Sequence, residues 1–88
     1  MKPFEDYDPL EKVIMHTIVK EIQQEIKNYP DCFTILIGWK LHQYIRMNYN
    51  NNPFNIPITV SSNNDVSYKF YSNIDGKIII SDGKSNEI

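Results

Sequence analysis

The sequence predicts an α+β fold, a two-layer sandwich in which a four-stranded mixed sheet carries two helices on one face. Three observations lead to this prediction: a helical apolar stripe early in the chain, short β-branched or alternating segments after it, and an Asp75-Gly76 turn signal near the end. The chain of 88 residues is long enough for a single domain over residues 1–88, with one modest core. The expected element order is α-β-α-β-β-β.

The first expected element is a helix that begins at Asp8-Pro9 and ends before Pro30. Aspartate at the N-cap and proline at the first helical position are a typical helix start, and proline cannot continue a helix. The core-facing stripe of this helix consists of Met15, Ile18, Val19, Ile22, Ile26 and Tyr29. Glu21 and Glu25 lie one turn apart on its flank, where we expect them to face water.

The same helix has a second apolar arc, rotated away from the stripe, which consists of Leu10, Val13, Ile14 and Thr17. Two explanations are open. Either an N-terminal arm over residues 1–7 folds back and covers the arc with Phe4 and Tyr7, or the arc binds a partner subunit. Singly exposed apolar residues are normal on protein surfaces, which favours the arm.

The middle of the chain is expected to form a strand and a second helix. Residues 33–37 are a continuous apolar run closed by Gly38, which is typical of a buried strand. Residues 39–48 then form a helix with Leu41, Tyr44 and Ile45 on one face. A single helix over residues 33–49 is the alternative, but Gly38 and the β-branched start argue against it.

Three more strands are expected in the second half of the chain, over residues 56–61, 66–71 and 77–81. The Asp75-Gly76 pair connects the last two as a hairpin, and residues 82–88 form a flexible polar tail. The first two strands of the chain are expected to be parallel, because a helix connects them. The last three strands are expected to form an antiparallel meander.

Composition narrows the class of protein. No apolar run reaches the roughly 18–20 residues of a membrane span, and the N-terminus is acidic, so we expect a cytoplasmic protein with no membrane partner. The single cysteine, Cys32, allows no internal disulfide and fits a reducing compartment. The lack of alanine and the many isoleucine, asparagine, lysine and tyrosine residues indicate a low-GC genome, either that of a bacterium or that of its phage.

No catalytic or metal-binding pattern is present in the sequence. His16, Cys32 and His42 are the only histidine and cysteine residues, and no pair of them has a zinc-site spacing. The chain also lacks a nucleophile elbow and a glycine-rich phosphate loop. We therefore expect no enzyme activity, no catalytic residue, no metal and no cofactor.

The favoured function is a small, non-enzymatic protein-interaction module that acts as an accessory protein. The expected partner-binding residues are Leu10, Val13 and Ile14 of the arc, and Trp39, His42 and Arg46 on the outer face of the second helix. Because most soluble oligomers are two-fold symmetric, a homodimer is also expected, either helix against helix or edge against edge.

The alternative function is a nucleic-acid-binding accessory factor. It would use a basic row on the first helix together with the Trp39–Arg46 surface, where the indole stacks on a base. The basic row consists of Lys12, His16, Lys20 and Lys27. The formal net charge of −2 disfavours this alternative, since nucleic-acid binders normally carry a surplus of positive charge.

Overall fold

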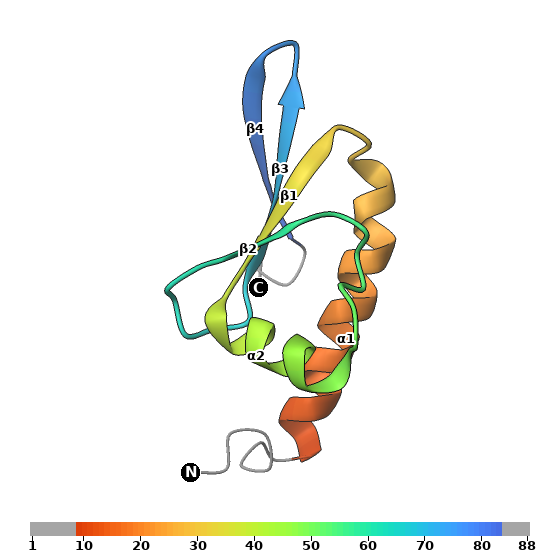
Figure 1. Ribbon diagram of the computed structural model, residues 1–88, viewed down its shortest axis with the longest axis vertical. Coiled ribbons are helices and arrows are strands. Elements are labelled where there is room, and N and C mark those ends of the chain that lie inside the picture. The colour runs from red at the N-terminus through yellow and green to blue at the C-terminus, as the bar shows by residue number, and fades with distance from the viewer. Residues whose placement is uncertain (1–8, 84–88) are drawn as a thin grey trace.

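The computed structural model describes residues 9–83 of the chain. Its elements are α1 (Pro9–Glu25), a 3-10 turn η1 (Ile26–Asn28), β1 (Cys32–Ile37), α2 (Trp39–Asn48), β2 (Ile58–Val60), β3 (Tyr68–Ile74) and β4 (Lys77–Asp82). The expected α+β fold is confirmed, with a four-stranded mixed sheet and two helices on one face of it (Figure 1). Neither described helix has the length and apolarity needed to cross a membrane.

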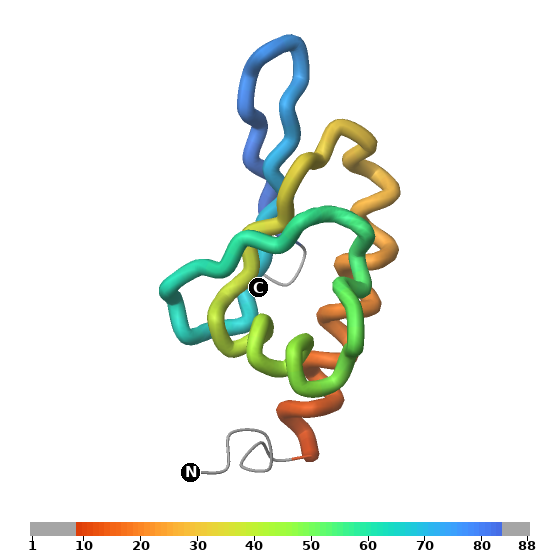
Figure 2. The backbone as a smooth tube through the Cα atoms, in the orientation of Figure 1, coloured from red at the N-terminus to blue at the C-terminus, as the bar shows by residue number. Residues whose placement is uncertain are grey.

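The strand order in the sheet is β2-β1-β3-β4. The predicted parallel pairing of the first two strands is confirmed, and they lie side by side. The antiparallel part consists of β1, β3 and β4, and not of the last three strands of the chain. The reason is that β1 lies between β2 and β3, so the chain must cross the end of β1 after leaving β2 (Figure 2).

Several strand boundaries differ from the prediction. Of the strand expected over residues 56–61, only the three residues of β2 are part of the sheet. The strand begins late because Pro57 has no N–H to donate and Asn55 has a left-handed backbone (φ 62°). At the other end, Asp82 belongs to β4, and the Gly83 N–H donates to the Tyr68 carbonyl (3.2 Å). The ordered chain therefore extends past the expected start of the tail. The expected arm over residues 1–7, the Asp8 N-cap and residues 84–88 lie outside the described residues.

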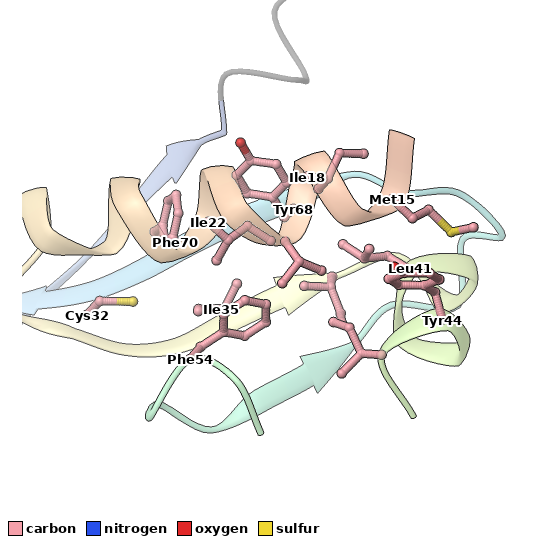
Figure 3. Close-up of a cluster of buried hydrophobic side chains, with 13 residues drawn as sticks. Met15, Ile18, Ile22, Cys32, Ile35, Leu41, Tyr44, Phe54, Tyr68 and Phe70 are labelled. Atoms are coloured by element: carbon pink, nitrogen blue, oxygen red, sulfur yellow. The ribbon is translucent and has the colours of Figure 1, made fainter. Parts of the chain in front are cut away.

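One apolar core joins both helices to the sheet (Figure 3). The predicted stripe of α1 is confirmed, since Met15, Ile18, Val19 and Ile22 are buried and Ile26 and Tyr29 pack against them in part. From the sheet, Ile35 and Ile37 of β1 and Tyr68 and Phe70 of β3 complete the core. Tyr29 stacks on Phe70 with ring centroids 4.7 Å apart, which closes the core below the end of α1.

The first strand is buried on one face only, which corrects the expectation of a fully buried strand. Phe33 is 45% exposed and Leu36 is half-buried, whereas Ile35 and Ile37 are fully covered. The cause is the placement of both helices on the same side of the sheet. The pairing of β1 with β3 also has a register irregularity between Cys32 and Thr34.

The carboxylates expected to face water are instead packed against β3. The Tyr68 hydroxyl donates to Glu25 Oε2 (2.5 Å) and lies 3.3 Å from Glu21 Oε1. Glu25 is buried and Glu21 is half-buried. A buried carboxylate is tolerated when a donor meets it, and Tyr68 supplies that donor from the facing strand.

The N-terminus of α2 is capped by main-chain carbonyls of the loop between β2 and β3. The N–H groups of Trp39 and Leu41 donate to the carbonyls of Asn63 (2.7 Å) and Asp65 (3.3 Å). A Cβ at Gly38 would collide with Asp65, so this close approach requires glycine. Because β1 and α2 are separate elements on either side of Gly38, the alternative of one helix over residues 33–49 is wrong.

The β3–β4 hairpin extends beyond β1 and α1 (Figures 1 and 2). Its turn is Asp75-Gly76, as predicted, and both residues have positive φ values, 53° and 80°. Such a pair fits the right-handed twist of the two strands. The turn therefore fixes the register in which β4 lies against β3.

Replacement of Gly76 by valine tests this turn. No other atom lies within 4 Å of a Cβ placed there, so the cost arises from the backbone alone. We expect Gly76→Val to lower the free energy of unfolding by about 1–2 kcal/mol, measured by urea denaturation. The control is Lys77→Val, at an ordinary strand position, with an expected change within about 0.5 kcal/mol. Equal stability of Gly76→Val and wild type would contradict the hairpin.

Candidate interaction surfaces

The arc on α1 is exposed in the described structure. Leu10, Val13 and Ile14 all have large accessible surfaces. Between them, Glu11 forms an ion pair with Lys40 of α2, which holds the first turns of α1 beside α2. The arm that was expected to cover the arc lies outside the described residues, so the choice between arm and partner subunit stays open.

The outer face of α2 carries the expected tryptophan and arginine. Trp39 is 46% exposed, and Arg46, two turns further along the helix, is also exposed. His42 lies between them and is half-buried. Burial, and to a smaller extent the charge of Arg46, lower the pKa of the His42 imidazole, which favours its neutral form.

A shallow polar depression continues from this face of α2. Its lining consists of His42, Ile45, Arg46, Tyr49, Asn50, Asn51, Asn52 and Ile58. The structure therefore brings two predicted binding residues, His42 and Arg46, into one depression. The arc on α1 does not contribute to it, so the predicted partner-binding residues form two separate surfaces.

The basic row lies on the outer face of α1, except for Lys27, which belongs to η1. His16, Lys20 and Lys27 are exposed and Lys12 is half-buried. Trp39 and Arg46, which the nucleic-acid alternative also needs, are on α2. The two halves of that predicted surface thus come from different helices, and the acidic Glu11 lies close to both.

Cys32 begins β1 and belongs to the core. Its thiol donates to the Thr34 carbonyl (3.2 Å), and burial raises the pKa of the thiol. A protonated, covered sulfur is a poor nucleophile. Within residues 9–83, no three histidine, cysteine, aspartate or glutamate side chains converge in a way that would hold a metal ion.

A further apolar surface of the described chain includes side chains that the sequence analysis did not name. Three consecutive isoleucines of β4, Ile78, Ile79 and Ile80, are 53%, 43% and 54% exposed. Ile78 and Ile80 lie opposite Asn73 and the half-buried Tyr71 on the face of the sheet without helices, whereas Ile79 lies opposite the buried Ser72 on the helix-bearing face. We call Tyr71, Ile78, Ile79, Ile80 and the free backbone edge of β4 the β4 surface. The signal in the sequence was the run of three isoleucines at positions 78–80, because a strand with an alternating pattern would have only one apolar face.

The two edges of the sheet differ in accessibility. The β2 edge has three residues and follows Pro57, which cannot donate a hydrogen bond. The β4 edge has six residues, with charges only at its ends, Lys77 and Asp82. Edge strands are usually blocked by proline or by central charges, and β4 has neither.

Comparisons with protein-family models, with curated proteins and with solved structures found no match to this chain. A small α+β fold does not by itself specify an activity, because function depends on the sites that the fold carries. The functional argument therefore rests on the surfaces described above.

The position of Cys32 predicts slow thiol chemistry. We expect the native protein to react with a thiol reagent at least about 100 times more slowly than the urea-unfolded protein, because the sulfur is covered and protonated. The measurement is the rate of labelling with an aromatic disulfide reagent at pH 7.5. A comparable rate in the two states would show an accessible thiol and would make a catalytic role worth testing.

Proposed function

We propose that the protein is a small, non-enzymatic protein-interaction module whose main contact is the β4 surface. The observation that carries this proposal is the exposure of three consecutive isoleucines on an open edge strand. Ile78 and Ile80 project from one face of the sheet and Ile79 from the other, so exposed apolar side chains flank the unpaired edge on both faces. Exposed apolar surface around such an edge marks an interaction site. The residue usage of the chain supports an origin in a low-GC bacterium or its phage, and the single cysteine, Cys32, supports a reducing compartment such as the cytoplasm.

Both the side chains and the backbone of β4 favour a protein partner. Covering the exposed half of each isoleucine contributes about 1 kcal/mol. The unpaired N–H and C=O groups of the edge add main-chain hydrogen bonds when an extended strand docks beside it. A nucleic acid fits the β4 surface less well, since it has no peptide backbone to pair with the edge and little aliphatic surface to cover the isoleucines.

The helix surfaces are secondary contacts in this proposal. Trp39 and Arg46 are of the residue types enriched at interface hot spots, and the arc of Leu10, Val13 and Ile14 adds apolar area at another place. The exposure of Trp39 also keeps the nucleic-acid alternative testable. In that case Trp39→Ala and Lys20→Glu would both reduce retention of the protein on immobilised single-stranded DNA at low salt.

Site-specific photo-crosslinking in cells of the native host tests the main proposal. With a photoreactive benzoylphenylalanine in place of Ile80, we expect crosslinks to a protein, because this position lies at the centre of the contact. The matched control carries the same group at Lys20, which is exposed on the outer face of α1 and lies outside the β4 surface. Equal crosslinking at Ile80 and Lys20 would contradict the proposal.

A further inference from the structure

Among residues 9–83, no strand pairs with the outer edge of β4, and this free edge has a defined set of backbone groups. The Gly83 N–H donates to the Tyr68 carbonyl (3.2 Å), so this pair is a hydrogen-bonded pair of the antiparallel ladder. On the other side of β3, the Gly38 N–H donates to Ser67 (2.8 Å), which fits the same alternation. Hydrogen-bonded pairs alternate along a ladder, so every second residue of β4 faces away from β3. The residues whose N–H and C=O groups point to the free edge are Ile78, Ile80 and Asp82.

This edge is complementary to itself. A two-fold axis perpendicular to the sheet brings two β4 strands together antiparallel and keeps each side chain on its own face. With the axis at Ile79, the outward N–H and C=O groups of Ile78 pair with those of Ile80 of the second copy. By symmetry, Ile80 pairs in the same way with Ile78 of the second copy. Ile79 meets Ile79 of the second copy at a position without hydrogen bonds, where opposed side chains lie closest.

Neighbouring registers fit less well. An axis at Ile80 places Ile78 opposite Asp82 of the second copy, so that an aliphatic side chain meets a charge. An axis at Ile78 places Ile79 opposite Lys77 of the second copy, with the same disadvantage. Among these registers, only the axis at Ile79 pairs every isoleucine of β4 with an isoleucine.

The charges of the edge also favour antiparallel pairing. Lys77 is at one end of β4 and Asp82, which already lies 3.7 Å from Lys69 of its own chain, is at the other, so in the antiparallel pair each Lys77 end lies beside an Asp82 end of the second copy. Lys77 comes opposite Ser81 and not opposite another lysine. Like charges, which ordinarily prevent two edges from meeting, are therefore kept apart.

We propose that two copies of this chain form a homodimer by antiparallel pairing of β4 with β4 about a two-fold axis at Ile79. This inference rests on the proposed function, because it names a second copy as the partner of the β4 surface. The pairing uses up the open edges, and the short β2 edges after Pro57 remain at the outside, so assembly stops at two copies. We expect a weak dimer, with a dissociation constant on the order of 1–100 µM.

Replacement of Ile79 by residues of opposite charge tests both the dimer and its register. In sedimentation equilibrium between about 1 µM and 1 mM, the mass of the wild type should rise from 10.4 kDa towards twice that value. Ile79→Lys and Ile79→Glu should each stay monomeric, because like charges meet at the axis. An equimolar mixture of the two should regain the dimer mass, because lysine then meets glutamate. Ile79 is 43% exposed, so both variants should keep the far-UV circular dichroism spectrum of the wild type.

The control is Val13→Glu on the arc of α1, which should dimerise like the wild type. If Val13→Glu is monomeric and Ile79→Lys is not, the dimer forms through the helices and the proposal is wrong. A mixture that stays monomeric overturns the register. A wild type that stays at 10.4 kDa up to about 1 mM overturns the dimer itself. In that last case, crosslinks from position 80 to a different protein would still uphold the proposed function, and their absence would refute both.

Discussion

Two helices cover one face of the four-stranded sheet and leave the other face uncovered. Most other properties of the described structure follow from this one-sided covering. The core lies on the covered face, between α1, α2, β1 and β3. On the other face the central strand β1 is only partly buried, and β4 projects past the end of α1 (Figure 1). Ile78 and Ile80, on the uncovered face, therefore stay about half exposed, and Ile79 on the other face of the projecting strand is also 43% exposed.

Polar contacts hold the helices in this arrangement. On one side, the Tyr68 hydroxyl connects β3 to the buried Glu25 of α1. At the end of β1, Gly38 allows the β2–β3 loop to approach closely enough to cap α2 with its carbonyls. These contacts set where the two helices lie, and hence which part of the sheet they leave uncovered.

The sequence predicted the elements that depend on local chemistry. The periodic stripe of α1, the glycine after β1 and the Asp75-Gly76 turn each act within a few residues, and the structure has all of them. The order of the strands and the exposure of Ile78–Ile80 depend on which segments meet across the sheet, which no local pattern specifies. For the same reason Glu25 was expected in water: its donor, Tyr68, is 43 positions away in the chain.

Amide hydrogen exchange measured by NMR tests the central claim, that β4 presents a free edge which a second copy occupies. At a protein concentration of about 1 µM, the account predicts fast exchange at the outward N–H groups of Ile78 and Ile80 and slow exchange at Ile79, which faces β3. At about 1 mM, exchange at Ile78 and Ile80 should slow by a factor of about five or more, as the monomer population falls, with little change at Ile79. Exchange rates at Ile78 and Ile80 that do not depend on concentration would contradict the account.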